Sequence, residues 1–441
     1  MAQAKEKDFV VNITKLTKAI NQKGFGLIMI YDTEKAHEYN IYSDISAVSE
    51  ECPVFSKAYK IASRIFAQNP RPQNVAIIGT TDTVEKPGTP GEFELTINKG
   101  FDENEIIEID GNKYKYVKEN SDAAKNEFDG DSPSTRALSL SSLLERDMKD
   151  FFFTVNENVI TLTQKISGVG KMPLVVSSRA NIRETTPAVL PTGLIAHLNN
   201  VREAHTEPFF LVCTDNSDET IKKLSNWIDT QDMMYFTTTQ NLSAPKLVRS
   251  EQTVIMYHND KDAYVAEGLA SYLATANVGA VTSKFKTING SPEAKITTGD
   301  LQELHKNNGF TYINKMGVLQ TTDGKTTSGE WIDVVMGAFW IKFKMEENLA
   351  YLAVNTPKIG YDNKGIGLLV GVCDSVLKQA AFSQDIVLIN SDGKAQYEIR
   401  YKTREETDKN DIANRVYNGI TWSAKLAGAI HKAVINGTLE Y

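Results

Sequence analysis

The sequence has little of what marks secreted, membrane or nucleic-acid-binding proteins. Its three cysteines, Cys52, Cys213 and Cys373, are odd in number and far apart, which favours buried thiols in a reducing compartment over disulfides. No apolar run looks long enough to span a bilayer, and the first residues lack an apolar signal core. The net charge is −8 and no dense Lys/Arg run occurs. We therefore expect synthesis in a cytoplasm, with neither nucleic acid nor membrane as a partner.

The sequence also lacks the short motifs of common enzyme classes. It contains no G-x-S-x-G, Walker loop, H-E-x-x-H or C-x-x-C. Residues 24–26 read G-F-G, but the third glycine of a dinucleotide-binding loop is missing. His197 and His205 lie near each other but span an expected helix end, so a metal pair is the less favoured interpretation. We expect no catalytic residue, no cofactor and no metal ion.

What the sequence does contain is an alternation of buried-strand and helical patterns. Apolar runs typical of buried strands occupy residues 24–33, 74–80, 208–215, 234–238 and 253–260, with helical spacing at 53–68, 191–204 and 218–229. Short alternation of this kind predicts an α/β lobe whose sheet is at least partly parallel. At 441 residues, the chain has room for two to four domains.

Acidic residues follow two of these strands, in CTDNSDE (213–219) and YHNDKD (257–262). A metal-dependent hydrolase would place acids at the carboxyl ends of strands. Helix N-capping explains the same positions, because a helical pattern follows each one and Ser217 or Asp218 suits an N-cap. Capping is the favoured interpretation, and an α/β enzyme with a β accessory domain is kept as an alternative.

A segment of different texture interrupts the α/β pattern after the Pro/Gly-rich stretch 81–92. Apolar and polar residues alternate with period two, and Asp110-Gly111 is a hairpin signal. Residues 92–131 hold 12 acidic and 5 basic side chains, nearly the whole net charge. A calcium loop at 101–110 is disfavoured because the EF-hand spacing is absent. We interpret the segment as a mainly β insert that faces outward and keeps a large assembly soluble.

The C-terminal third carries two long helical patterns. Apolar residues recur at helical spacing from Trp331 to about residue 354, and Pro357 ends that helix. A second helix follows, with Asp362 or Asn363 as N-cap. Its glycines, Gly365, Gly367 and Gly371, are expected to permit close helix packing rather than to bind phosphate.

These C-terminal motifs resemble those of one known family. The stretches are SGEWID (328–333), the helix with its internal tryptophan, NTPKIGYDNKGI (355–366), NNGFTYINKMGV (307–318) and ITWSAKLAGAIHKAVINGTLEY (420–441). Together they closely resemble the C-terminal core of contractile tail-sheath proteins. The resemblance covers the chain from about residue 254 to its end; it is fair over the first 80 or so residues and weak between.

The resemblance implies a structural subunit of a phage tail sheath. Such subunits stack as hexameric rings around a tail tube and contract to drive the tube through the host envelope. The implied partners are further copies of the chain, the tail tube protein, and the baseplate and tail terminator proteins, and the implied location is the virion. The sheath of a phage-tail-like bacteriocin or injection system is the alternative within the same fold.

The expected fold class is a multi-domain α/β (α+β) protein with a mixed sheet, flanking helices, a mainly β inserted outer domain and extended terminal arms. The expected division is an N-terminal arm (1–18), the first part of the α/β core (19–86), the mainly β insert (87–172), an α/β sheath domain (173–300), an inner sheath domain (301–425) and a C-terminal arm strand (426–441).

The expected site residues serve assembly. The strand-like stretch DFVVNIT (8–14) is either an edge strand or an arm that adds a strand to a neighbour; the resemblance favours the arm. The arm residues are Phe9, Val10, Val11, Ile13, Ile430, Val434, Ile435 and Leu439. Inner-core packing is expected of Trp331, Phe339, Trp340, Tyr361 and Trp422. Contact with an acidic tube is expected of Arg415, Lys425 and Lys432, within the last helix and strand, with solvated charges as the alternative.

Overall fold

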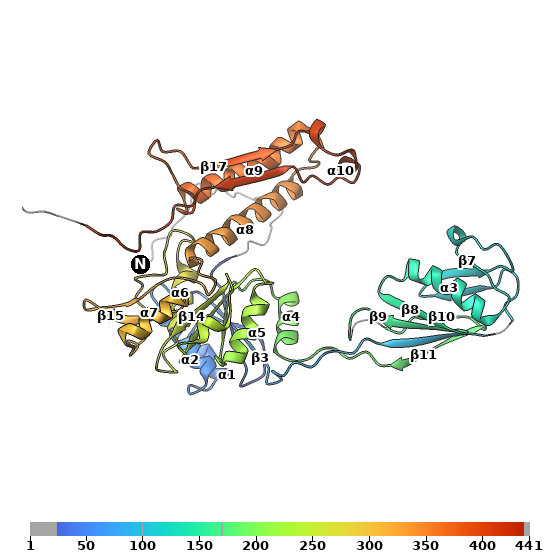
Figure 1. Ribbon diagram of the computed structural model, residues 1–441, viewed down its shortest axis with the longest axis horizontal. Coiled ribbons are helices and arrows are strands. Elements are labelled where there is room, and N and C mark those ends of the chain that lie inside the picture. The colour runs from blue at the N-terminus through green and yellow to red at the C-terminus, as the bar shows by residue number, and fades with distance from the viewer. Residues whose placement is uncertain (1–23, 99, 169–170, 436–441) are drawn as a thin grey trace, which may run out of the picture. The chain divides into compact units, whose positions relative to one another are not determined.

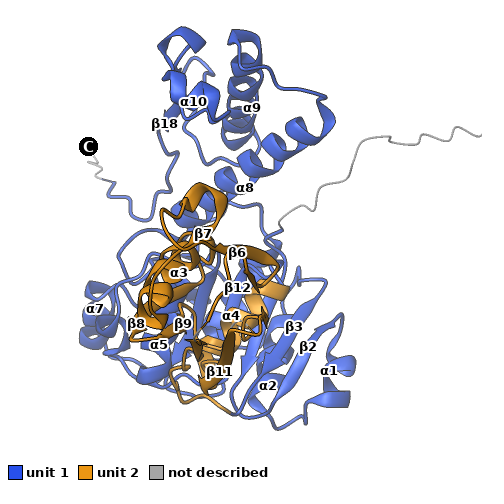
Figure 2. Cartoon of the chain, turned by 90° about the vertical axis from the view of Figure 1, so that its right-hand side faces the viewer, with its two compact units in different colours: residues 1–81, 205–441 blue, residues 82–204 orange. Residues whose placement is uncertain are grey.

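The computed structural model describes residues 24–98, 100–168 and 171–435, drawn in colour in Figure 1. The chain divides into two compact units (Figure 2). The α/β unit comprises residues 1–81 and 205–441, and the insert unit comprises residues 82–204. Each unit is described by itself below. The expected arm residues Phe9, Val10, Val11, Ile13 and Leu439 lie outside the described residues.

The α/β unit is built on an 8-stranded sheet in the order β16-β15-β14-β13-β12-β1-β3-β2. The strands from β15 to β3 run parallel, and the two edge strands β16 and β2 run antiparallel to their neighbours. The bounds are β1 Ile28–Asp32, β2 His37–Tyr42, β3 Val75–Gly79, β12 Phe210–Cys213, β13 Met234–Thr239, β14 Thr253–Tyr257, β15 Phe310–Lys315 and β16 Val318–Thr321. The expected mixed sheet, at least partly parallel, is therefore confirmed.

Helices cover this sheet because successive strand residues point to opposite faces. On one face Ile28, Phe210 and Phe236 belong to the large core cluster that also holds Ile61 of α2 and Leu269 of α6. On the other face Ile255 of β14 packs with Ile221 of α5 and with Ala244. The helices and the short 3-10 turn are α1 Ile45–Glu51, α2 Lys57–Phe66, α5 Asp218–Ile228, η2 Ala244–Leu247, α6 Val265–Thr275 and α7 Thr298–Lys306.

Two long helices follow the sheet. Helix α8 spans Ile332–Asn355 and ends before Pro357, as the proline predicts. Helix α9 spans Asn363–Phe382, and the side chain of its N-cap Asp362 accepts a hydrogen bond from Gly365 N at 2.7 Å. The expected cap at Ser217 is also present, since its hydroxyl accepts from Thr220 N.

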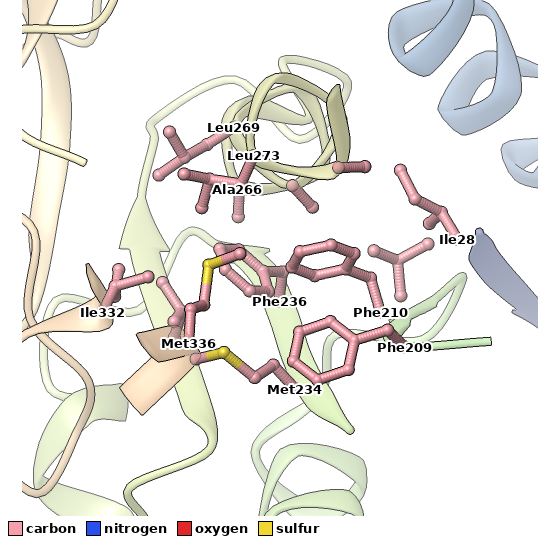
Figure 3. Packing of buried hydrophobic residues seen from close by; sticks show 14 of the residues in the cluster. Ile28, Phe209, Phe210, Met234, Phe236, Ala266, Leu269, Leu273, Ile332 and Met336 are labelled. Atoms are coloured by element: carbon pink, nitrogen blue, oxygen red, sulfur yellow. The ribbon is translucent and has the colours of Figure 1, made fainter. Parts of the chain in front are cut away.

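An aromatic cluster joins α8 to the amino ends of the parallel strands. The Phe209 ring precedes β12 and lies 4.5 Å from Phe25, 5.4 Å from Phe339 and 6.1 Å from Phe343, centroid to centroid. All three contacts have the edge-to-face geometry that aromatic pairs prefer. Close by, Met336 of α8 reaches the same core as Met234 of β13 (Figure 3). The first half of α8 is thus fixed to the sheet by its buried face.

The chain after α9 forms a small antiparallel hairpin and two short helical turns. Strand β17 spans Tyr397–Tyr401 and β18 spans Ile420–Ala424. Between them lie η3 Arg404–Glu406 and α10 Lys409–Ala413.

The insert unit is mainly β, as expected, but longer than expected. Its sheets have the orders β10-β5-β6-β7 and β11-β4-β9-β8. The expected end at residue 172 is wrong, because Val175 of β10 pairs with Ile109 and Ala180–Thr186 (β11) pairs with β4. The remaining elements are β4 Glu92–Ile97, β5 Ile106–Ile109, β6 Asn112–Tyr116, η1 Ala123–Lys125, β7 Glu127–Phe128, α3 Pro133–Asp147, β8 Phe151–Asn156, β9 Val159–Gln164, β10 Val175–Val176 and α4 Leu194–Ala204.

The hairpin signal in the insert is confirmed. Asp110 and Gly111 connect β5 to β6, and both have positive φ, 45° and 82°. Two consecutive positive φ values are what a two-residue hairpin turn of the primed type needs, and Asp-Gly tolerates them. In the stretch where a calcium loop is disfavoured, the acids form ion pairs, since Arg179 lies 3.1 Å from both Asp102 and Glu105.

Helix α9 passes the length and composition test for a membrane span, the one helix in the described part of the chain to do so. The expectation that no apolar run is long enough was therefore too strict. A single helix that meets these criteria is weak evidence for a membrane span, and 39% of its apolar 18-residue stretch is buried. Its buried residues Val376, Leu377 and Ala380 belong to the core of the α/β unit.

We predict that Phe209→Ala destabilises the α/β unit by about 3–5 kcal/mol, because the cavity would lie at the junction of α8 and the sheet. All four tryptophans lie in the α/β unit, so tryptophan fluorescence during urea unfolding reports on this unit alone. Phe382→Ala, whose side chain is 58% exposed, is the control and should cost about 0.5 kcal/mol or less. Equal effects of both substitutions would contradict the role given to the cluster.

Candidate assembly surfaces

The β17–β18 hairpin has one polar and one apolar face. Residues directly opposite each other share a face, so Tyr397, Ile399 and Tyr401 lie with Ala424, Trp422 and Ile420. Tyr397, Ile399 and Ala424 pack against the core. The Tyr397 hydroxyl donates to Asp374 of α9 at 2.6 Å. The hairpin therefore lies on α9 through part of its apolar face only.

The remainder of that apolar face is open. Tyr401 is 52% exposed and Trp422 is 43% exposed. Trp422 was expected to pack in the inner core, and that expectation is wrong, because its side chain lies on the open part of this face. An exposed aromatic pair on a sheet face is typical of a surface that another element covers.

Both edges of the hairpin carry unused backbone groups. Lys425 N donates to Gln396 O at 2.9 Å and Lys402 N donates to Gly419 O at 3.1 Å, which sets the alternation of the antiparallel ladder. The backbone groups of Ile399 and Trp422, midway between, accordingly point away from the partner strand. No third strand joins this sheet within the described residues. A two-stranded sheet with two open edges can accept a strand on each side.

Tyr361 connects the loops around the hairpin by hydrogen bonds and a ring contact. It does not pack in the inner core, where it was expected. Its hydroxyl donates to Val416 O at 2.7 Å, its ring meets Tyr417 edge-on at 6.0 Å, and its carbonyl accepts from the Arg404 guanidinium. The loop before α9 is thereby tied to the loop before β18.

The other expected inner-core residues lie in or near the core. Trp340 is 6% exposed, and Phe339 packs against the same cluster as Phe209. Trp331 is half-buried at the N-cap of α8.

The C-terminal tail does not form the expected strand within its own chain. After β18 only an isolated bridge, Val387 to Leu426, continues the pairing, and residues 427–435 have no regular structure. The apolar side chains of Ile430, Val434 and Ile435 are 88%, 75% and 91% exposed. A strand forms only against a partner ladder, and the tail has none here. The expected arm strand (426–441) would pair with another subunit and extends into residues 436–441, outside the described residues, so it stays a prediction.

The three expected cations are exposed but lie outside helix and strand. Arg415 follows α10 with φ 58°, Lys425 follows β18, and Lys432 is in the tail. The expected placement within the last helix and strand is thus wrong. Within the described residues, none of the three has an ion-pair partner among those identified.

The carboxyl ends of β1 and β12 are where an enzyme with this sheet would bind its ligand, because the strand order reverses there. Asp32 is 3% exposed, and its carboxylate accepts from Thr214 Oγ1 at 3.1 Å and from Glu34 N at 2.9 Å. Its second oxygen lies 3.0 Å from His37 Nε2. The carboxylate is fully used by its own neighbours, which favours a structural role.

The capping interpretation is confirmed after β12 and wrong after β14, because the N-cap of α6 is Tyr264, which makes no side-chain capping hydrogen bond. The Asp215 carboxylate accepts from Ser217 N at 3.0 Å and from the Thr220 hydroxyl at the start of α5. Asp260 accepts from Asp262 N at 3.0 Å, and Asp262 pairs with Lys60 at 2.7 Å. No group of three or more His, Cys, Asp or Glu suited to a metal ion is found in the described ranges.

Helices α8 and α9 enclose an uncharged groove of about 590 Å³. Its walls include Tyr351 and Leu352 of α8 and Leu368 of α9. A Cβ added at Gly367 or Gly371 would meet nothing within 4 Å, so these glycines do not permit the expected close packing within the chain. Gly365 does need its small size, because a Cβ there would lie 1.9 Å from the Gly360 carbonyl oxygen.

Comparisons with known proteins find likeness in fold alone. No family model matches the chain, and no curated protein matches it. The anti-feeding prophage helical sheath in its contracted state matches with a TM-score of 0.57 at 8% identity, covering 100% of both chains. A chain of the anti-feeding prophage baseplate in its contracted state matches at 0.53 and 9% identity, covering 98% of this chain and 97% of that one. The sheath tail protein Lin1278 from Listeria innocua matches at 0.45 and 12% identity, covering 87% and 89%.

The chain has the fold of contractile sheath proteins. The helical sheath of the anti-feeding prophage is one protein of this fold that the chain matches over its full length.

The buried carboxyl of Glu267 makes the stability of the α/β unit depend on pH. Glu267 of α6 is 2% exposed, and its carboxylate accepts from Thr238 Oγ1 at 2.5 Å and from Thr238 N at 3.2 Å. Burial raises the pKa of Glu267 from 4.5 to about 7. The folded protein therefore keeps a proton that the unfolded chain releases between these values.

We predict that stability falls as pH rises from about 4.5 to about 7, by at most about 1.4 kcal/mol per pH unit from this group, because ionisation is disfavoured only in the folded state. Glu267→Gln should flatten this fall, measured as the melting temperature between pH 5 and 7.5. Glu219→Gln, whose carboxyl is 78% exposed, should leave the slope unchanged. An unaltered slope in Glu267→Gln would refute the assignment.

Proposed function

We propose that this chain is the structural subunit of a contractile tail sheath. It would polymerise as stacked hexameric rings around a tail tube and contract to drive the tube through the host envelope. The observation that carries the proposal is the match in fold over the full length of a helical sheath protein. In this role the chain is not an enzyme, and it is a component of the virion.

The open hairpin and the unpaired tail fit each other as parts of one assembly device. Strands β17 and β18 offer outward backbone groups on two edges, and the tail offers exposed apolar residues without a partner strand. We propose that the C-terminal tail and the N-terminal stretch 8–14 of neighbouring subunits each add a strand to this hairpin. Trp422 and Tyr401 would then be covered by the incoming side chains.

Strand pairing of this kind suits a sheath that changes shape. Hydrogen-bonded arms keep neighbours connected, while the packed units exchange one set of lateral contacts for another as rigid bodies. The free energy of contraction lies in the difference between the contacts of the two states. The acidic insert would face outward, where its charge keeps the particle soluble.

The remaining partners follow from the same role. Arg415 and Lys425 flank β18 in sequence and Lys432 lies in the tail; these exposed cations are the proposed contacts for an acidic tube surface. Baseplate and tail terminator proteins would bind the two ends of the stacked rings. A second candidate is the sheath of a phage-tail-like injection particle, favoured by the two anti-feeding prophage chains that match with TM-scores above 0.5.

Negative-stain electron microscopy of the purified full chain at rising concentration tests the proposal. We expect hollow, striated tubes in the contracted form, because no inner tube is present to template the extended one. A monodisperse monomer or dimer at every concentration, including under crowding with polyethylene glycol, would contradict a self-assembling sheath.

We predict that removing the arms separates folding from polymerisation. Deletion of residues 1–18 or of residues 432–441 should leave the melting temperature of the α/β unit within a few degrees of the full chain but abolish tubes, because the hairpin edges then lack incoming strands. Deletion of residues 1–7, which spares the strand-like stretch 8–14, is the matched control and should form tubes. Tubes from either long deletion would refute the strand-adding arms.

A further inference from the structure

The C-terminal tail touches its own subunit at one well-defined place after it leaves the hairpin. Ala427 N donates to Ile386 O at 3.0 Å, and Gly428 then turns the chain with φ 65°. Beyond this turn, Ile430 is 88% exposed, whereas the next residue, His431, is partly buried. In Figure 1 the dark red tail runs from the hairpin past the start of α8.

His431 is held by three side chains of the α/β unit. Its Nε2 lies 2.7 Å from Thr282 Oγ1. Its ring stands edge-on to Trp331 at 4.4 Å and 83°, and edge-on to Phe285 at 6.2 Å and 88°. One hydrogen bond and two edge-on aromatic rings make a specific binding site for the imidazole ring. We call Thr282, Phe285 and Trp331 the His431 seat.

The two aromatic rings of the His431 seat are themselves held in place by neighbouring residues. Lys325 Nζ lies 4.8 Å from the centroid of the Trp331 ring, and Lys284 Nζ lies 5.3 Å from that of Phe285. Such cation–π contacts stabilise both rings. Phe285 also has φ 64°, a left-handed conformation that a bulky residue adopts only where its surroundings hold it.

We propose that Thr282, Phe285 and Trp331 form a docking site for the C-terminal tail of the same subunit, with His431 as the anchor that fixes where the tail becomes free. Residues on either side of His431 contribute little, since Ile430, Val434 and Ile435 are exposed. The site thus holds the tail at a single side chain.

For assembly, which rests on the proposed sheath function, the anchor limits the reach of the tail. The chain continues for ten residues after His431 (432–441), about 33 Å if extended, whereas a tail released back to Gly428 would have thirteen residues and reach about 43 Å. The anchor also removes conformational freedom before a neighbour binds, which lowers the entropic cost of pairing. His431 is accordingly a positioning residue for the proposed arm.

The seat favours the neutral imidazole. Burial is the main cause that lowers the pKa of His431 from 6.5; Lys284 and Lys286 act in the same direction, and Asp323 and Asp333 oppose them. The second ring nitrogen, Nδ1, is buried without a partner among the described residues, so protonation leaves a buried donor unused. Docking should therefore weaken as pH falls below about 6.5, the ordinary pKa of histidine.

A distance measurement on the full chain tests the anchor directly. Nitroxides at Val434→Cys in the tail and Val318→Cys on β16 are read by pulsed electron resonance; the three native cysteines are buried. In the parent, which carries only the two labelled cysteine substitutions, we expect a narrow distance distribution at pH 7.5. This distribution should broaden when His431→Ala or Thr282→Val is added. Lys432→Ala, an exposed neighbour, should leave it narrow. Acidification to pH 5.5 should broaden the parent distribution and leave that of His431→Ala as it was.

A broad parent distribution at pH 7.5, or one unchanged by His431→Ala, would overturn the docking site. Matching thermal melts of the variants exclude general unfolding as the cause of broadening. Electron microscopy separates this proposal from the sheath function: a narrow parent distribution without tubes would overturn the sheath role and leave the docking site standing. If tubes form, we expect His431→Ala to need at least about tenfold higher concentration. Tube formation by His431→Ala at the same concentration as the parent chain would overturn the role of the anchor in assembly.

Discussion

The packing of α8 against the amino ends of the parallel strands is the constraint on which the rest of the α/β unit depends. Phe209 sits at the centre of that junction, between the strand β12 that it precedes and the rings of Phe339 and Phe343. The same helix fixes both ends of the described chain. Phe25, near the first described residue, packs on Phe343 at 5.5 Å, and His431 packs on Trp331 before the first turn. Helix geometry separates these two points by about 18 Å.

The open hairpin is the second constraint, and it links fold to assembly. Part of its apolar face packs on the core, yet two aromatic side chains are exposed and no third strand joins either edge within the described residues. Isolated two-stranded sheets are marginal in water, and open edges invite strand addition. The proposed sheath explains the same features at once: a hairpin completed by arms from other subunits is a full sheet in the assembly and an incomplete one in the monomer.

Much of the fold could be predicted because local chemistry decides it. Ser217 and Asp362 are capping residues at helix starts, Pro357 follows the end of α8, and uninterrupted apolar runs mark strands buried on both faces. The end of the insert was missed because β10 is two residues long and β11 carries mostly exposed residues, so pairing with β4 leaves no periodic signal. Trp422 was misplaced for a different reason. Its burial depends on what lies beside it in space, which one sequence does not encode locally. The His431 seat joins residues 282, 285, 331 and 431, and no spacing rule brings such positions together.

Helical reconstruction of assembled tubes by cryo-electron microscopy tests the central claim most directly, because it shows what lies beside β17 and β18. The account predicts an extended strand from another subunit hydrogen-bonded to each edge of the hairpin, with Trp422 covered. Tubes in which both edges of the hairpin remain in solvent would contradict it.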